Sequence, residues 1–597
     1  MYGLPFATAL STALSMLPAA DRTGLGDSEL SISDMRAWSM AKAGEHYKYT
    51  LAFRAIQNIL APIHRLPPEI LSRIFVEAWE NRRSFRLTHV CRLWRSILLN
   101  TSEFWAVAIS KDQFRLSPSD DSNWEDSNAE DYFGAAYLRS APRDISLNLS
   151  SLSFKGHLQL IDRAERITTM RFYAHTRDQL KCLWTVLHVG MPRLEDLAVR
   201  TSDKIVSWDG PKPCLSTKEL PLLTRLSLPA SLFPSSWPNI LQELTLRSDH
   251  VPFRVCLDIL FGSLEDLLSL RVLDVRDNSI CSNGPLAQPF RAFPTLELLR
   301  IRSDRETVSG VLSLLTFPPS TRIDIGIDSR PPFIFDHIEE KDLFVQGSSL
   351  DGVAALVDQV TFRSGPTSTI CGLTEGTERL RITASFSEWS LPYFEHAIRL
   401  FERTGAPVSR FLLTQHPGQR MCTMARSWRV LPAFPHITHL ALHASDSICD
   451  DIFGDLQCRR MVPPPDTMLP STSLPLLKEL TVGVGVERGT GWLLRQPASE
   501  GNISAPGGAV APHMRESCGL FPGFLEAGCR SGYRLSRLEI FSYEERYGMA
   551  KAYSDYIASH VDLAALAPGP VEREIAPLRA WVDGPVVFSG HRLYTDA

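Results

Sequence analysis

The sequence predicts an α/β protein in which a small all-helical module precedes an irregular solenoid of short strands and helices. Two observations lead to this prediction. Residues 61–110 place apolar side chains at the spacing of one helix face. From about residue 141, short segments of the form Leu-x-x-Leu-x-Leu recur instead. At 597 residues the chain is too long for one ordinary core, whereas an elongated repeat array has no such limit.

The first helix of the module is expected to start at two consecutive prolines. Pro67 and Pro68 suit the first turn of a helix, where their missing N–H groups cost nothing. Glu69 lies in the same turn, near the positive end of the helix dipole. One face of this helix is then apolar, with Ile70, Leu71, Ile74, Phe75 and Ala78.

A second helical run and a short third segment complete the module. The second run carries the apolar residues Leu87, Val90, Cys91, Trp94, Ile97 and Leu98. Asn100, Thr101 and Ser102 end this run or cap the third segment, which carries Phe104, Trp105, Val107 and Ile109. A unit of about fifty residues buries little surface by itself, so its exposed apolar side chains are candidates for a partner's groove. The alternative is a helical hairpin buried in a larger helical domain.

This stretch resembles an F-box of the kind found in fungal F-box-like proteins. The residues that carry the resemblance run from Ile63 through Phe75, followed by Val90, Cys91, Trp94 and Arg95. The resemblance implies docking to the Skp adaptor of cullin–RING ubiquitin ligases. It implies the following adaptor-binding residues: Leu66, Pro67, Pro68, Glu69, Ile70, Leu71, Ile74, Phe75, Val90, Cys91 and Trp94.

The repeated segments resemble irregular leucine-rich repeats. Aligning Leu197, Leu226, Leu244, Leu273 and Leu299 gives steps of 29, 18, 29 and 26 residues, mostly within the range of such repeats. Alternation places these leucines inward on short, adjacent parallel strands, with polar residues between them facing out. Residues 176–189 and 251–270 have helical spacing between strands. Later copies contain Leu442, Val482 and Ile540, and residues 578–590 are expected to end the array with a strand. A compact α+β domain is the alternative.

The predicted organisation has five parts. Residues 1–34 form a flexible or loosely helical leader, for which a weak signal peptide is the alternative. Residues 35–60 form a helix that packs against the F-box-like domain of residues 61–110. Residues 111–140 hold an acidic linker, or less simply a docking site for a basic partner, and a short helix. Residues 141–597 form the repeat domain, with long loops at 457–474 and 496–513.

Composition argues for a cytoplasmic or nuclear protein that binds other proteins. The net charge of −5 gives no basic field for nucleic acid, and no segment reaches the length of a membrane span. The eleven cysteines are odd in number, scattered and without a C-x-x-C pair, which indicates reduced thiols.

No motif for catalysis, a cofactor or a metal stands out, so we expect a non-enzyme without a cofactor. His436, His439 and His443 have metal-like spacing, but on a strand His436 and His439 point to opposite faces. The glycines of residues 483–491 match neither phosphate-binding pattern.

The sequence therefore favours a substrate-recognition subunit of a Skp–cullin–F-box ubiquitin ligase. The outward strand residues Asp196, Arg225 and Glu243 are the candidates for contact with an unidentified protein substrate. The alternatives are an adaptor-binding scaffold outside ubiquitin transfer, or an enzyme with an unrecognised site.

Overall fold

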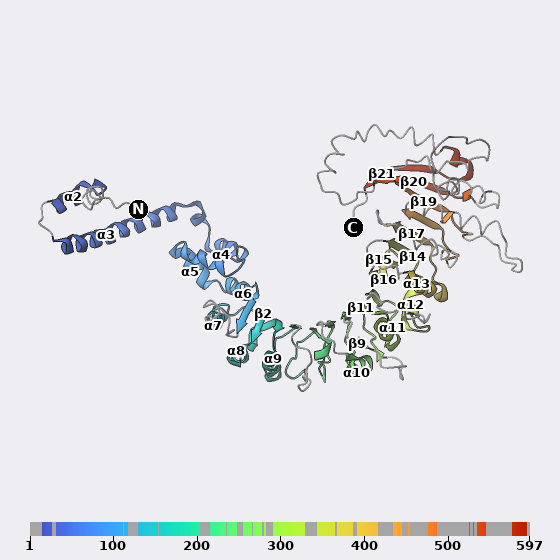
Figure 1. Cartoon of the computed structure of the whole chain (residues 1–597), viewed down its shortest axis with the longest axis horizontal. Helices are drawn as coiled ribbons and strands as arrows, with labels where there is room; N and C mark the ends of the chain where they lie inside the picture. The colour runs from blue at the N-terminus through green and yellow to red at the C-terminus, as the bar shows by residue number, and fades with distance from the viewer. Residues whose placement is uncertain are drawn as a thin grey trace, which may run out of the picture. The chain divides into compact units, whose positions relative to one another are not determined.

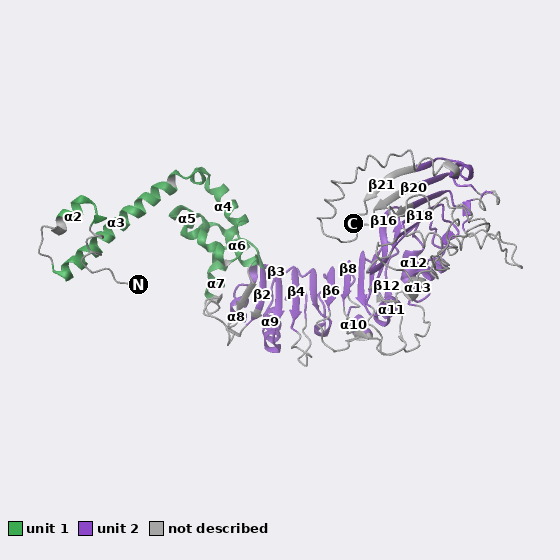
Figure 2. Cartoon of the chain, turned by 45° about the horizontal axis from the view of Figure 1, so that its top comes forward, with its two compact units in different colours: residues 1–113, 130–146 green, residues 114–129, 147–597 purple. Residues whose placement is uncertain are grey.

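The structure is a computed structural model whose described residues form two compact units (Figure 2). The first unit comprises residues 1–113 and 130–146, and the second comprises residues 114–129 and 147–597. The structure describes residues 15–26, 31–111, 113–116, 129–152, 154–202, 215–234, 236–247, 255–264, 267–276, 280–281, 291–328, 343–364, 367–385, 391–415, 431, 434–443, 452–453, 474, 476–485, 524–525, 529, 534–544 and 576–593.

The first unit is essentially helical. Its elements are α2 (Ala19–Gly26), α3 (Ile32–Leu60), η1 (Pro62–Arg65), α4 (Pro68–Glu77), η2 (Arg82–His89), α5 (Arg92–Asn100), α6 (Ser102–Lys111) and α7 (Ala129–Arg139). The helix expected over residues 35–60 is confirmed as α3, which Ser31 caps by accepting a hydrogen bond from the Asp34 N–H. The expectation that its apolar residues pack against the module is wrong for Tyr47, Tyr49 and Phe53, whose side chains are exposed.

Aromatic rings fill the core of the module. The ring of Trp79 meets that of Phe104 edge-on at 5.1 Å between centroids, and Phe85 lies 5.4 Å from Trp105. Helix α7 joins this core, because Tyr132 lies 5.4 Å from Phe85. The third segment is confirmed as α6, on which Phe104, Trp105 and Ile109 are buried. The second run is only partly helical as expected, since α5 begins at Arg92 and Leu87 lies in the 3₁₀ helix η2.

The second unit is a mixed α/β structure built on one large, open and mostly parallel sheet (Figure 1). Its strands, in spatial order from the pairings, are β2 (Ile145–Leu152), β3 (Ile167–Ala174), β4 (Asp196–Thr201), β5 (Arg225–Pro229), β6 (Glu243–Arg247), β8 (Val272–Arg276), β11 (Leu298–Ser303), β13 (Arg322–Ile327), β16 (Thr377–Ser385), β15 (Thr367–Thr374), β14 (Gln359–Ser364), β17 (Arg410–Gln415), β18 (His439–His443), β19 (Glu479–Gly485), β20 (Arg537–Glu544) and β21 (Val586–Leu593). Strand β1 (Gln113–Leu116) pairs with β2.

Helices lie along one side of this sheet (Figure 1). They are α8 (Phe154–Ile161), α9 (Arg177–Val189), α10 (Leu257–Ser263), α11 (Arg305–Leu314), α12 (Ser349–Ala354) and α13 (Leu391–Thr404). Short segments complete the described part: β7 (Val255–Cys256), β9 (Ile280–Cys281), β10 (Arg291–Ala292), β12 (Leu315–Thr316), η3 (Ala164–Arg166), η4 (Ala230–Leu232) and η7 (Ala576–Trp581). The helix expected at residues 176–189 is confirmed as α9, whereas the described residues between 251 and 270 contain the short strand β7 and the short helix α10.

The five aligned leucines form one continuous row, as the sequence predicts. Leu197 pairs with Leu226, Leu226 with Leu244, Leu244 with Leu273, and Leu273 with Leu299, each on neighbouring parallel strands. All five side chains are buried. The later copies continue the pattern, because Leu440 pairs with Leu480, Leu480 with Leu538, and Leu538 with Val586.

The sheet departs from a simple repeat at one place. Strand β15 runs antiparallel between β14 and β16, so that β16 rather than β14 follows β13 in space. A two-residue turn with positive φ at Glu375 and Gly376 joins β15 to β16. Among the described helices, none combines the length and the apolar content needed to cross a membrane.

Candidate functional site

The first candidate surface begins at the start of α4. Pro67 is the N-cap and Pro68 the first helical residue of α4. The backbone N–H groups at the start of a helix have no partner within the helix, and proline has no N–H group, so these two positions leave none unpaired. Glu69 lies in the first turn, where its negative charge stabilises the positive helix end. The two prolines and Glu69 therefore favour the start of α4 at this position.

Apolar residues of α4 point to two sides. Leu71 and Phe75 belong to the core of the module, with exposed fractions of 0% and 1%. Ile70 and Ile74 are 43% and 40% exposed, and Leu66 just before the helix is 36% exposed. Leu71, which the resemblance implied as an adaptor contact, is fully buried in the interior of the module.

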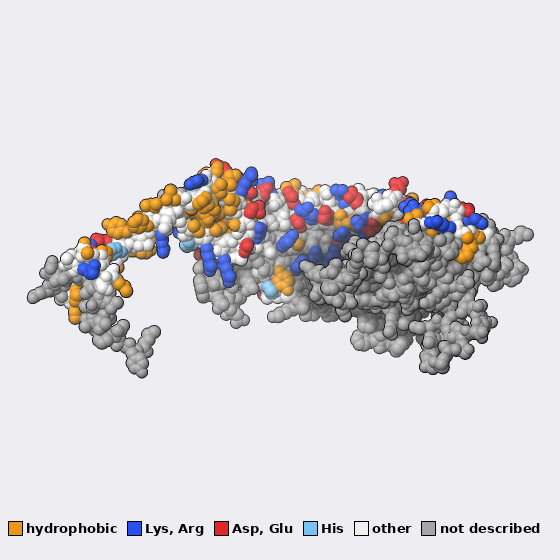
Figure 3. Space-filling model, turned by 90° about the horizontal axis from the view of Figure 1, so that it is seen from above, with side chains coloured by type: hydrophobic (Ala, Val, Ile, Leu, Met, Phe, Trp, Pro, Cys, Tyr) orange, Lys and Arg blue, Asp and Glu red, His pale blue; other side chains and the backbone are white. Residues whose placement is uncertain are grey.

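Two further exposed apolar side chains are Val90, at the end of η2, and Leu93, in the first turn of α5. The half-buried Trp94 holds α5 against α4, since its ring lies 4.8 Å from that of Phe75. The Cys91 sulfur lies 3.7 Å from His64 Nε2, which joins the same helix to η1. We call Leu66, Ile70, Ile74, Val90 and Leu93 the apolar face, and Figure 3 shows hydrophobic side chains gathered over α4 and α5.

The implied adaptor-binding residues thus separate into three groups. Leu71 and Phe75 are buried, and Cys91 and Trp94 are half-buried. The remaining seven are exposed: Leu66, Pro67, Pro68, Glu69, Ile70, Ile74 and Val90. Leu93 is an exposed neighbour that the sequence reading left out.

The second candidate surface lies on the strands, on the side opposite the buried leucines. Asp196, Arg225 and Glu243 occupy one cross-strand row on β4, β5 and β6. Arg225 Nε lies 3.5 Å from Asp196 Oδ2, and both side chains are partly exposed. The structure therefore brings together the three residues chosen from the sequence as candidates for contact with a substrate.

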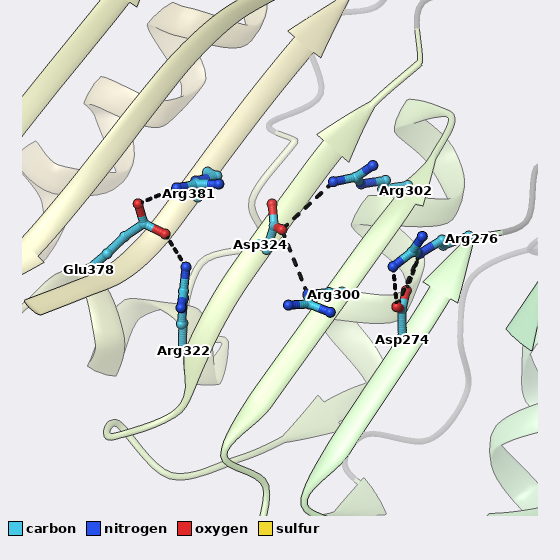
Figure 4. A network of polar contacts seen from close by, with 8 residues as sticks. All are labelled: Asp274, Arg276, Arg300, Arg302, Arg322, Asp324, Glu378 and Arg381. Carbon is cyan, nitrogen blue, oxygen red and sulfur yellow. Dashed lines mark hydrogen bonds and ion pairs between the residues drawn. The ribbon is translucent and has the colours of Figure 1, made fainter. Parts of the chain in front are cut away.

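A denser network of charges follows on β8, β11, β13 and β16 (Figure 4). The Arg276 guanidinium donates hydrogen bonds of 2.7–3.0 Å to the buried Asp274 carboxylate. Glu378 accepts hydrogen bonds from Arg322 at 2.6 Å and from Arg381 at 2.7 Å. The buried Asp324 lies between Arg300 and Arg302, at 3.9 Å and 4.0 Å.

These pairings shift the pKa values of Arg276, Glu378 and Arg381. Hydrogen bonds to Asp274 raise the pKa of Arg276, and those to Glu378 raise the pKa of Arg381. Burial acts to raise the pKa of Glu378, but the hydrogen bonds and charges of Arg381 and Arg322 outweigh it and lower that pKa. The direction of each of these three shifts favours the charged form of the group.

The sequence reading missed these arginines, although a signal was present. In four repeats an arginine stands three residues after the aligned leucine, as Arg200, Arg247, Arg276 and Arg302. A residue at that position is outward, because strand side chains alternate. Comparing equivalent outward positions across the repeats would have found the row.

The histidines do not form a shared site. His439 begins β18 and lies 3.3 Å from Glu479, whereas His436 precedes the strand and is exposed. Within the residues that the structure describes, no group of three or more His, Cys, Asp or Glu side chains is arranged to hold a metal ion. The acidic stretch 117–128 and most of the long loops 457–474 and 496–513 lie outside the described residues.

No family model matches the chain, and no curated protein matches it at a significant level.

Proposed function

We propose that the protein is a non-catalytic substrate receptor of a Skp–cullin–F-box ubiquitin ligase. The helical module acts as the F-box, and the second unit acts as a leucine-rich-repeat-like solenoid that holds a protein substrate. The observation that carries this proposal is the apolar face. It stands on a small module whose own core is already filled by other side chains, so it is available for a partner.

The apolar face has the properties of a helix-in-groove docking site. Ile70 and Ile74 are one turn apart on α4, and Leu66 lies just before the helix. Full burial of one such side chain contributes about 1.5–3 kcal/mol, so a few of them suffice to anchor an adaptor. The buried Leu71 and Phe75 then act indirectly, by holding α4 in place.

The second unit supports the role of a recognition surface. Its in-register parallel strands present polar outward residues in rows across the sheet. The helices α8–α13 lie along one side of the same sheet (Figure 1). Asp196, Arg225 and Glu243 are proposed substrate contacts in this arrangement. A ligase subunit of this kind needs no catalytic residue, because holding the substrate near the conjugating enzyme raises the effective concentration of its lysines.

Co-purification with a Skp-family adaptor and a cullin tests the proposal. The full chain should retain the adaptor, and the double variant Ile70→Asp with Ile74→Asp should lose it. Leu138→Asp is the matched control, because Leu138 is an exposed apolar residue on α7 of the same unit. Adaptor binding that persists in a folded double variant, or that disappears equally in the control, would contradict the proposed docking face.

A further inference from the structure

Arginines line up on the outward side of neighbouring strands in the second unit. Arg247 on β6 pairs in register with Arg276 on β8. Val275 pairs with Ile301, so the next residues, Arg276 and Arg302, also lie side by side. Neighbouring strands are about 4.8 Å apart, so the Cα atoms of Arg247, Arg276 and Arg302 lie within about 10 Å of one another.

The strands that hold this row carry more positive than negative charge. Strands β6, β8, β11, β13 and β16 contain seven arginines and four carboxylates, an excess of three positive charges. Like charges directly opposite each other on a sheet are destabilising. The excess therefore favours an anion from outside the sheet.

Two of the arginines keep hydrogen-bond donors for such an anion. Arg300 and Arg302 lie 3.9 Å and 4.0 Å from Asp324, which is beyond hydrogen-bond distance. Their side chains are 38% and 54% exposed, so a ligand can reach them. A guanidinium presents its N–H groups as a planar fork that matches a carboxylate.

The same sheet already shows how two of its arginines bind one carboxylate. Glu378 accepts from Arg322 on β13 and from Arg381 on β16, at 2.6 Å and 2.7 Å. Arginines on adjacent strands are thus spaced to clamp a single glutamate. Arg276 and Arg302 also stand on adjacent strands, β8 and β11, with Arg300 two residues before Arg302.

We propose that this arginine row, Arg247, Arg276, Arg300 and Arg302, binds a peptide segment rich in Asp and Glu. The inference rests on the proposed function and deepens it, because it gives the chemistry of the segment that the receptor captures. Nucleic acid fits less well, since Asp274, Asp324 and Glu243 stand among the arginines and the whole chain carries a net charge of −5.

Fluorescence anisotropy on the full chain without any adaptor tests the proposal. The probe is a short labelled peptide of alternating glutamate and glycine, and the control peptide has glutamine in place of glutamate. The glutamate peptide should bind, its affinity should fall as salt is raised, and the glutamine peptide should not bind. Arg300→Gln with Arg302→Gln should weaken binding about tenfold or more.

Arg271→Gln is the matched control variant. Arg271 stands just before β8 and pairs with the exposed Glu297, so its loss removes one positive charge outside the row. If the double variant does not fold, the single variant Arg302→Gln takes its place, because that side chain is more than half exposed.

Three results would overturn the proposal. They are unchanged binding by the arginine variants, equal binding of the glutamine peptide, and tighter binding of a phosphoserine peptide or a single-stranded RNA than of the glutamate peptide. Because the adaptor is absent from this assay, a failure here is distinct from a failure of adaptor docking.

Discussion

Ile70 and Leu71 are adjacent in the chain but lie on different sides of α4, one 43% exposed and the other fully buried. Successive helix residues are about 100° apart, so such a division is expected of neighbours at the edge of a core. The division separates the two roles of this helix. Leu71 holds the module together, whereas Ile70 belongs to the apolar face.

Substitutions at these two positions should therefore have opposite consequences. Leu71→Ala should lower the free energy of unfolding by about 2–5 kcal/mol, because it leaves a cavity in the core. Ile70→Ala should change stability by less than about 1 kcal/mol and should weaken adaptor binding. Thermal unfolding and adaptor titration of both variants check this. Equal destabilisation by the two substitutions would place Ile70 in the core as well.

The leucine row should account for much of the stability of the second unit. Leu273→Ala should cost about 2–5 kcal/mol, because Leu273 is fully buried between Leu244 and Leu299. Leu222→Ala is the control, since Leu222 is exposed near the start of β5. Urea unfolding gives both values. A similar small effect for the two variants would show that the row is not a packed core.

The leucine row was predictable because the alternation of buried and outward residues is written locally in each repeat. Strand β15 was not, because residues 359–385 lack the repeated leucine frame and the position of β15 depends on pairing with β14 and β16. The turn at Glu375 and Gly376 indicates a hairpin, but it does not say which strand lies next to β13.

The candidate docking site was predicted in part, for a similar reason. Helical spacing groups Ile70, Leu71, Ile74 and Phe75 on one broad apolar side, but spacing alone does not say which half of that side meets the core. The aromatic cluster around Trp79 and Phe104 decides this, and it is assembled from residues far apart in the chain. The arginine row has a sequence signal, an arginine three residues after several of the aligned leucines, and the strand register then shows that Arg247 and Arg276 lie side by side.

Reversing the charges of Asp196, Arg225 and Glu243 together should change the proteins captured by the full chain. The pair between Asp196 and Arg225 is partly exposed, and reversing both partners keeps opposite charges side by side, so the stability should change by about 1 kcal/mol or less and the fold should stay intact. Quantitative mass spectrometry of captured proteins makes the comparison. An unchanged set, with adaptor binding retained, would show that the substrate is held elsewhere.

Acidification should weaken the charge network through Glu378. The folded-state pKa of Glu378 is lowered by Arg381 and Arg322, so its ionised form stabilises the fold above the ordinary glutamate pKa of about 4.3. That contribution is lost as the pH falls through the lowered folded-state pKa. Glu378→Gln should be less stable than the parent at pH 7, and the difference should shrink as the pH falls below the ordinary glutamate pKa. A difference that stays constant with pH would contradict an electrostatic role.

Gly326 should control the position of Arg302 without changing any charge. A Cβ at Gly326 would lie 2.8 Å from Arg302 Cγ, so Gly326→Ala should push the arginine side chain away from its place across β13. We expect this variant to bind the glutamate peptide more weakly than the parent, while its affinity for the adaptor stays the same. Gly352→Ala on α12 is the control, because a Cβ there meets only Pro319 atoms, at 3.5 Å and 3.8 Å. If Gly326→Ala binds the peptide as tightly as the parent, the location of the Arg302 guanidinium does not matter for recognition.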